Sequence, residues 1–282
     1  MTKIAINGIG RIGKLVLKLL LQNKYDIKYL NEINGDTKSL IHSLEFDSIH
    51  GKWDDYFELN NDSIKINNKE IKTTFFSNIE DLDLDDIDLV IDCTGKYKNT
   101  LKLQKYFDKG IKKIIVSAPI NEDNVVNIAY GVNHNIYKPK EHNIITGASC
   151  TTNCIAPIIK VLHENIGINH GSITTIHNLT NSQTLVDIPH NDLRWGRSAF
   201  NNLIPTTTGS AKAISLIYPE LKGRLNGHAV RVPILNSSLT DCVFEMKLST
   251  NKEQINNLLK SASDNELKNI CLLYTSPSPR DR

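Results

Sequence analysis

Cys150 is the residue of this sequence whose type and setting point most directly to chemistry. Residues 147–157 read Gly-Ala-Ser-Cys-Thr-Thr-Asn-Cys-Ile-Ala-Pro and follow an apolar run through Ile145 that predicts a strand. Ser149 is a favourable N-cap, so a helix is predicted to begin at Cys150. The unpaired N–H groups and the positive dipole end of a helix start favour a thiolate over a thiol. Cys150 is therefore a candidate covalent nucleophile.

His177 is the candidate base for that nucleophile, because it ends Thr174-Thr-Ile-His, an apolar run that predicts a strand. The alternative interpretation is a buried cysteine at a helix start and an unrelated histidine. The residues alone leave both interpretations open, because local cysteine signatures do not transfer between protein families. Cys154, one helical turn after Cys150, is expected to pack in the core.

The composition is that of a globular protein from a reducing compartment. Of the 282 residues, 40% are hydrophobic and 23% are charged, which excludes a disordered chain and allows one large or two medium domains. The net charge of +2, from lysines spread along the chain, argues against nucleic acid as a partner. Five irregularly spaced cysteines do not read as a disulfide framework. No apolar run reaches membrane-spanning length and none forms a signal peptide, so we expect a cytoplasmic protein without a membrane partner.

A dinucleotide-binding motif opens the chain. Residues 3–13 read as an apolar strand running into G-x-G-x-x-G, with an apolar helix pattern behind it. Gly8 permits the tight turn, Gly10 the approach of a pyrophosphate, and Gly13 close contact between helix and strand. Glu32 ends the next predicted strand, where an acid hydrogen-bonds an adenosine ribose and repels a 2′-phosphate. The sequence therefore favours NAD over NADP, although a solvated strand-end charge is the alternative for Glu32 alone.

Strands and helices alternate through the rest of the N-terminal half. Residues 88–95 and 113–119 read as strands on either side of a helix predicted over residues 100–107, and this order implies a parallel, doubly wound sheet. Ligands of such sheets bind beyond the carboxyl ends of the strands. Thr94, Gly95 and Ser117 are therefore candidate cofactor contacts, although structural turn residues would look the same.

Longer strands follow the cysteine helix. Residues 171–177, 227–235 and 238–248 read as strands, and the last has the alternation of a half-exposed antiparallel strand. An α+β domain with a mainly antiparallel sheet is therefore expected. A long polar loop without periodicity, residues 178–204, contains Arg194. Loops of this length within compact domains are usually functional or interfacial.

Two further features of this half would attract an anion. Residues 205–210, Pro-Thr-Thr-Thr-Gly-Ser, open a predicted helix, where hydroxyls and free N–H groups form a potential phosphate site. Arg231, in Val-Arg-Val-Pro, is a lone cation on an apolar strand. Burying it unpaired would be costly, so an anionic ligand or a carboxylate partner is implied.

Together these motifs resemble phosphorylating glyceraldehyde-3-phosphate dehydrogenase. The family's Asn-Gly-x-Gly-Arg-Ile-Gly is matched by residues 7–13, its Ser-Cys-Thr-Thr-Asn by 149–153 and its catalytic histidine by His177. Its Pro-Thr-x-Thr-Gly-x-Ala-Lys is matched by 205–212 and its Arg-Val-Pro by 231–233. The matches follow the family order over most of the chain. They imply a Rossmann-type domain followed by a catalytic domain.

The resemblance also implies roles. Cys150 would attack the aldehyde of glyceraldehyde 3-phosphate, His177 would take the proton, hydride would pass to NAD, and inorganic phosphate would release an acyl phosphate from the thioester. Thr180 and Arg231 fall on the family's substrate-phosphate site, and Arg194 is a further candidate phosphate ligand. The attacking phosphate would meet Ser149, Thr151, Thr208 and Gly209. The candidate cofactor contacts are Gly8, Gly10, Arg11, Ile12, Gly13, Glu32 (usually Asp in the family), Thr94, Gly95 and Ser117.

Some segments resemble a branch of the family found beside arsenic-efflux genes, namely residues 45–47, 177–180 and 225–231. For that branch the resemblance implies arsenate in place of phosphate, which gives an unstable arseno-phosphoglycerate. The two oxyanions are nearly isosteric, so the residues do not decide between them. Oxidation of erythrose 4-phosphate is a less favoured activity within the same family.

The C-terminal end departs from the family pattern. After Asn269 a strand, an Asn-Glu-Trp-Gly-Tyr segment and a final helix are expected, whereas residues 271–282 carry Ser-Pro repeats and no strand or helix pattern. We therefore expect an NAD-binding domain over 1–148, an incomplete catalytic domain over 149–270 and an unrelated tail over 271–282. The resemblance implies a homotetramer if the chain is complete.

Two other functions stay open at this point. A truncated chain would bind NAD through its first domain without turnover, because the nicotinamide would not be held. A papain-like Cys–His hydrolase would share the Cys150–His177 pair, although the glycine-rich start argues against it. His50, His134 and His190 show no metal-ligand spacing, so no metal is expected.

Overall fold

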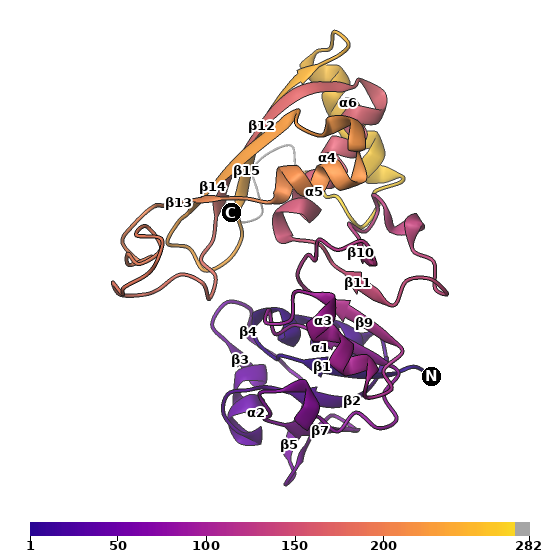
Figure 1. Cartoon of the computed structure of the whole chain (residues 1–282), viewed down its shortest axis with the longest axis vertical. Coiled ribbons are helices and arrows are strands. Elements are labelled where there is room, and N and C mark those ends of the chain that lie inside the picture. The colour runs from indigo at the N-terminus through magenta and orange to yellow at the C-terminus, as the bar shows by residue number, and fades with distance from the viewer. Residues whose placement is uncertain (274–282) are drawn as a thin grey trace. The chain divides into compact units, whose positions relative to one another are not determined.

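The computed structural model describes residues 1–273 and divides into two compact units (Figure 1). Unit 1 comprises residues 1–128 and 135–148, and unit 2 comprises residues 129–134 and the chain from 149 onward. Of the expected tail, residues 274–282 lie outside the described residues.

Unit 1 is built on a nine-stranded sheet of order β10-β11-β9-β8-β1-β2-β7-β6-β5. Its strands are β1 (Lys3–Asn7), β2 (Asp26–Asn31), β5 (Phe57–Leu59), β6 (Ser63–Ile66), β7 (Lys69–Thr74), β8 (Leu89–Asp92), β9 (Lys113–Val116), β10 (Val125–Asn127) and β11 (Ile144–Thr146). Neighbouring strands from β10 to β7 in this order pair in parallel. At one edge of the sheet β6 pairs antiparallel with β7, and β5 pairs antiparallel with β6. The predicted parallel sheet is confirmed.

Three helices connect these strands: α1 (Arg11–Gln22), α2 (Thr37–Glu45) and α3 (Thr100–Phe107), and a short pair, β3 (Phe46–Asp47) and β4 (Gly51–Lys52), follows α2. Alternate residues of β1 face two different cores. Ile4 and Ile6 pack in the cluster of Leu17 from α1, whereas Ala5 packs in the cluster of Leu103 from α3. Both faces of the strand are therefore covered, which explains why it reads as a continuous apolar run.

The strand registers align the carboxyl ends of the central strands. Asn7, the last residue of β1, pairs with Asn31 of β2 on one side and with Asp92 of β8 on the other. Asn31 in turn pairs with Thr74 of β7. The loops that follow these strands therefore leave the sheet from one edge, which is where a doubly wound sheet binds its ligand.

Unit 2 has a four-stranded sheet of order β13-β14-β12-β15. The strands are β12 (Ile168–His177), β13 (Ile204–Thr207), β14 (Leu225–Arg231) and β15 (Leu239–Met246). β12 pairs parallel with β14, whereas the β12–β15 and β13–β14 pairs are antiparallel. The sheet is therefore mixed, with antiparallel pairs in the majority, because the connection from β12 back to β14 includes a helical crossover.

Helices α4 (Cys150–Asn165), α5 (Ser210–Ile217) and α6 (Lys252–Asp264) belong to the same unit. Ile155 and Ile159 of α4 form one core with Ile173 of β12 and Ile214 of α5. This core fixes the start of α4 relative to the end of β12. Residues 178–203 form the predicted loop without helix or strand.

Candidate active site

Cys150 is the first residue of α4, and its sulfur lies beside His177, the last residue of β12. Ser149 is the N-cap, as predicted, and its Oγ accepts a hydrogen bond from Thr152 N at 3.1 Å. The distance from Cys150 Sγ to His177 Nε2 is 3.2 Å. The structure thus brings the candidate nucleophile and the candidate base into direct contact.

The electrostatic setting of Cys150 favours the thiolate. The hydrogen bond with His177 lowers the pKa of the thiol from 9.0 to about 7, against the opposing effect of burial. The Thr151 hydroxyl, 3.9 Å from the sulfur, adds to the lowering. Near neutral pH a large fraction of Cys150 is therefore ionised and nucleophilic.

A third residue, Arg231, completes this cluster. The parallel register places Arg231 of β14 opposite His177 of β12. Its Nη1 lies 2.6 Å from His177 Nδ1 and donates to the carbonyl oxygen of Asn178 at 2.9 Å. The same carbonyl lies 2.8 Å from His177 Nδ1. Asn178 was not singled out from the sequence, because its contribution is a main-chain oxygen that any residue type would supply.

Arg231 retains an unused donor in this cluster. Burial lowers the pKa of its guanidinium, and its Nε is buried without a hydrogen-bond partner among residues 1–273. Within the same residues, no carboxylate forms an ion pair with it. Of the two partners that the sequence implied, the anionic ligand is therefore the one that this geometry favours.

Two of the hydroxyl-bearing candidates, Thr180 and Thr208, lie in turns of unit 2. Thr180 Oγ1 lies 2.9 Å from Ser182 Oγ and 3.0 Å from Gln183 Oε1. Thr208 Oγ1 lies 2.9 Å from Ser210 Oγ, just ahead of α5. Gly209 is the N-cap of α5 without a side-chain cap, and a Cβ added to it would meet nothing within 4 Å. Ser210 N, the first N–H group of α5, donates to Thr208 Oγ1 at 3.3 Å, and the space beside Gly209 is open to a ligand.

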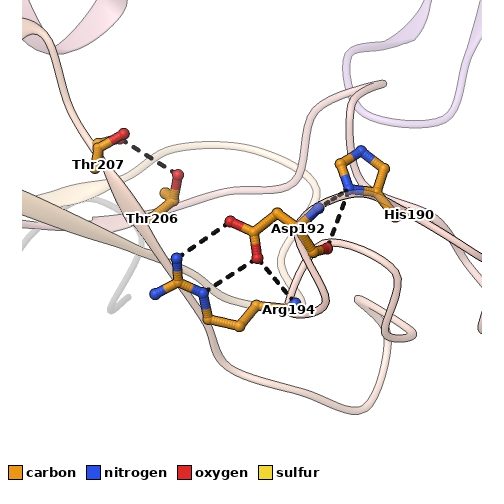
Figure 2. Close-up of polar contacts among 5 residues, drawn as sticks. All are labelled: His190, Asp192, Arg194, Thr206 and Thr207. Carbon is orange, nitrogen blue, oxygen red and sulfur yellow. Dashed lines mark hydrogen bonds and ion pairs between the residues drawn. The ribbon is translucent and has the colours of Figure 1, made fainter.

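Arg194 is placed differently from the other phosphate candidates. Figure 2 shows its guanidinium turned towards Asp192, with Nη2 3.1 Å from Oδ2 and Nε 3.3 Å from Oδ1. His190 Nδ1 accepts from Asp192 N at 3.0 Å in the same turn. The contacts of Arg194 are thus within its own exposed loop, and the structure does not bring it to Cys150, His177 or Arg231.

In unit 1, the three motif glycines have different surroundings. A Cβ on Gly8, whose φ is +90°, would lie 2.7 Å from Thr94 N, and a Cβ on Gly13 would lie 1.9 Å from Gly8 O. A Cβ on Gly10 would meet nothing within 4 Å. Gly8 and Gly13 are therefore required by the packing of the protein itself. The space at Gly10, at the start of α1, fits a bound pyrophosphate.

A cavity of about 540 Å³ adjoins this helix start and is lined by Ile9, Gly10, Arg11 and Glu32 among others. Glu32 Oε2 accepts from Ile9 N at 2.8 Å, which ties the acid to the glycine loop. Arg11 and Ile12 form the first turn of α1, with Ile12 exposed. An acid beside a helix start is the arrangement that NAD requires for its ribose and pyrophosphate.

Thr94, Gly95 and Ser117 follow β8 and β9 at the carboxyl edge of the same sheet. The Thr94 hydroxyl donates to Asp92 Oδ1 at 2.7 Å, and Ser117 N donates to the carbonyl oxygen of Asp92 at 2.9 Å. Gly95 has a φ of +66° and open space at its Cβ position. All three therefore lie where the doubly wound topology predicts a cofactor.

Comparison with known proteins matches both halves of the chain. Residues 2–100 match the NAD binding domain of glyceraldehyde 3-phosphate dehydrogenase, and residues 149–278 match the C-terminal domain. Glyceraldehyde-3-phosphate dehydrogenase 3 of Nostoc sp. is 49% identical over 93% of this chain and 78% of that protein. The Geobacillus stearothermophilus enzyme is 43% identical over 98% of this chain and 82% of that protein.

The chain belongs to the glyceraldehyde-3-phosphate dehydrogenase family. The match of the N-terminal half to the family's NAD-binding domain identifies NAD as the cofactor, in agreement with the acid at position 32. Among residues 1–273, no helix is both long enough and apolar enough to cross a membrane.

One expectation about α4 was wrong. Cys154 is exposed, with its sulfur 3.9 Å from Thr240 Oγ1, and does not pack in the core. The buried face of this glyceraldehyde-3-phosphate dehydrogenase helix runs through Ile155, Ile159 and Leu162. Cys154 lies one residue off that face, about 100° around the helix from Ile155. The chain therefore presents two accessible thiols one helical turn apart, of which Cys150 alone contacts His177.

Proposed function

We propose that this chain catalyses the NAD-dependent oxidation of glyceraldehyde 3-phosphate through a thioester on Cys150. The observation that carries the proposal is the 3.2 Å contact between Cys150 Sγ and His177 Nε2, together with the lowered pKa of the thiol. Family membership supports the same reaction, since the relatives are named for it.

In the proposed reaction the Cys150 thiolate forms a bond to the aldehyde carbon, and the carbonyl electron pair moves to oxygen. The main-chain N–H groups at the start of α4 are available to that developing negative charge. His177, which holds the proton of the Cys150 thiol, gives it to that oxygen to form the thiohemiacetal hydroxyl, and takes it back as the carbon loses its hydride and the thioester forms. NAD, when bound, supplies the two-electron acceptor for this oxidation. An oxyanion then attacks the thioester carbon, and the Cys150 thiolate leaves.

Arg231 and Thr180 would bind the phosphate that the substrate already carries. The unpaired Nε of Arg231 supports this role, because a phosphate would supply the missing acceptor. The attacking oxyanion would be bound by Ser149, Thr151, Thr208 and Gly209, and the open space beside Gly209 at the start of α5 supports that assignment. Arg194 would have to leave Asp192 in order to join either phosphate.

The cofactor contacts that we propose are those of the unit 1 carboxyl edge. The pyrophosphate would be held by Gly10 and by the first turn of α1, with Arg11 and Ile12, and the packing of Gly8 and Gly13 would shape the loop around it. Glu32 would bind the adenosine ribose, and its link to Ile9 N keeps the carboxylate in place. Thr94, Gly95 and Ser117 would contact the remainder of the dinucleotide.

The attacking oxyanion is phosphate or arsenate, and the segments that resemble the arsenic-associated branch favour testing both. With phosphate the product is 1,3-bisphosphoglycerate, and with arsenate it is 1-arseno-3-phosphoglycerate, which hydrolyses. A homotetramer in the cytoplasm is the setting that we propose by analogy with the family.

The decisive experiment follows NADH absorbance after purified chain, NAD and glyceraldehyde 3-phosphate are mixed with phosphate or arsenate. We expect NADH formation that Cys150→Ser abolishes. The control, Cys154→Ser, removes an exposed thiol one helical turn away and should change the rate of NADH formation by no more than about twofold. The oxyanion with the higher kcat/KM identifies the physiological reaction. NADH formation that survives Cys150→Ser would contradict the mechanism. NAD binding without any NADH from the wild-type chain would support the binding-only alternative.

A further inference from the structure

A fully buried carboxylate lies beneath the cofactor edge of unit 1. Asp92, the last residue of β8, is 0% exposed, and among residues 1–273 no Lys, Arg or His forms an ion pair with it. Its charge is met by hydrogen-bond donors instead. Thr94 N and Thr94 Oγ1 donate to Oδ1 at 3.0 and 2.7 Å, and the Tyr106 hydroxyl donates to Oδ2 at 2.7 Å.

This carboxylate sets the direction of a longer hydrogen-bond chain. Burial raises the pKa of Asp92, and the hydrogen bonds from Thr94 and Tyr106 oppose that shift. In its ionised form the carboxylate only accepts, so Tyr106 donates to Asp92 and its own oxygen is left to accept. It accepts from Asn7 Nδ2 at 2.6 Å. The other end of the Asn7 amide, Oδ1, then accepts from Asn31 Nδ2 at 2.8 Å. The Asn7 amide is therefore oriented from both ends, by Tyr106 and by Asn31.

The chain continues across the next strand with the same direction. Asn31 Oδ1 accepts from Thr74 Oγ1 and from Phe76 N, each at 2.9 Å. Thr74 Oγ1 lies 2.6 Å from the Tyr29 hydroxyl, which must donate because Thr74 has already given its proton to Asn31. One series of donors therefore points towards Asp92 across β7, β2, β1 and β8, while Asn31 Nδ2 also donates to the carbonyl oxygen of Phe76 at 2.9 Å. Hydrogen bonds aligned in this way polarise and strengthen one another.

Residues of this hydrogen-bond chain precede or contact the cofactor contacts proposed above. Asn7 immediately precedes Gly8, Asn31 immediately precedes Glu32, and Asp92 holds Thr94. The turn at Thr94 also packs on the glycine loop, since a Cβ on Gly8 would lie 2.7 Å from Thr94 N. A change at Asp92 would thus reach the pyrophosphate loop, the ribose acid and the β8 turn together.

We infer that Asp92 is a positioning residue of the NAD site, whose carboxylate holds the Thr94 turn directly and, through Tyr106 and the hydrogen-bonded Asn7 and Asn31, keeps Gly8 and Glu32 in their binding arrangement. The inference rests on the cofactor contacts proposed above. It assigns no chemical step to Asp92, which is buried beneath the site.

The test is NAD titration by calorimetry on the 282-residue protein, which requires no turnover. In Asp92→Asn the new amide donor must face either Thr94 or Tyr106, both of which are donors already. We expect the Kd for NAD to rise about tenfold, while kcat at saturating NAD stays within about twofold. The matched control is Asp88→Asn, at the opposite end of β8, where the carboxylate accepts from Lys3 N and Lys112; its Kd should stay within about twofold.

Tyr106→Phe provides a second variant, which removes the link to Asn7 and leaves the Thr94 contacts. We expect it to raise the Kd for NAD about threefold, and it carries the test if Asp92→Asn does not fold. The rate of Cys150 alkylation without NAD should not change in any variant, because that thiol belongs to unit 2. An unchanged Kd in the folded variants, or a fall in kcat as large as the loss of affinity, would overturn the inference. NADH formation by the wild-type chain tests the proposed function separately.

Discussion

The carboxyl edge of the unit 1 sheet and the Cys150 cluster of unit 2 differ in whether their buried polar groups have hydrogen-bond partners. In unit 1 the strand-end side chains satisfy one another, from Tyr29 through to the carboxylate of Asp92. In unit 2 the structure leaves Thr175 Oγ1 and Arg231 Nε buried without partners among residues 1–273. With the roles proposed above, the strand ends beneath the cofactor would be satisfied by the protein itself, whereas Arg231 would keep a donor for the anion that it binds.

The largest expected effect removes the base from the reacting cluster. His177→Asn should lower kcat by about 10²- to 10⁴-fold. It should also return the pKa of Cys150 from about 7 towards 9.0, because the hydrogen bond to His177 is the main cause of the lowering. Since the thiolate is the reactive form, alkylation by iodoacetamide speeds up as pH rises through that pKa. The midpoint of the alkylation rate against pH should therefore move upward in the variant.

His170→Asn is the matched control for that experiment, since His170 lies on the same strand and is exposed. It should leave both kcat and the alkylation midpoint unchanged. A midpoint that stays near pH 7 in His177→Asn would show that the helix start, and not the histidine, ionises Cys150.

An intermediate effect is expected from the unused donor. Arg231→Gln should raise the KM for glyceraldehyde 3-phosphate by about ten- to a hundredfold, the range for a hydrogen bond to a charged group. Steady-state kinetics at fixed NAD measures the change. Arg224→Gln, at an exposed position just before β14, is the control and should leave KM within about twofold. Equal KM values for the two variants would show that Arg231 does not take part in substrate recognition.

The smallest effects separate packing from binding within the glycine motif. Gly13→Ala would place a Cβ 1.9 Å from Gly8 O, so we expect a loss of about 1–3 kcal/mol of stability and a melting temperature lower by several degrees. Gly10→Ala has open space and should leave the melting temperature unchanged while weakening NAD binding severalfold. Thermal unfolding and NAD titration on both variants measure the two effects. A destabilised Gly10→Ala would mean that the protein, and not the ligand, requires that glycine.

Much of the local structure could be predicted because the signals are local. Ser149 and Cys150 occupy the predicted cap and first helical position, since capping depends on a few neighbouring residues. The helix predicted over residues 100–107 is α3. Alternation of strands and helices was sufficient for the parallel sheet, because parallel strands need a crossover.

Contacts set by the packing of helices and by loop conformation could not be predicted in the same way. The bond between Asn7 and Tyr106 joins residues 99 positions apart, and neither residue type signals the other. The exposure of Cys154 depends on which face of α4 meets the sheet, and a shift of one residue changes the result. The ion pair between Arg194 and Asp192 forms within a loop that has no periodic pattern from which to infer side-chain direction.

The parallel register of β12 and β14 has a consequence for substrate selection. His177 and Arg231 are the last residues of adjacent strands and pair directly across the sheet. With the roles proposed above, two rigid backbones set the distance between the carbon that reacts and the anion that anchors it. The sheet would then fix that distance, and the site would select aldehydes by the number of bonds between their carbonyl and their phosphate.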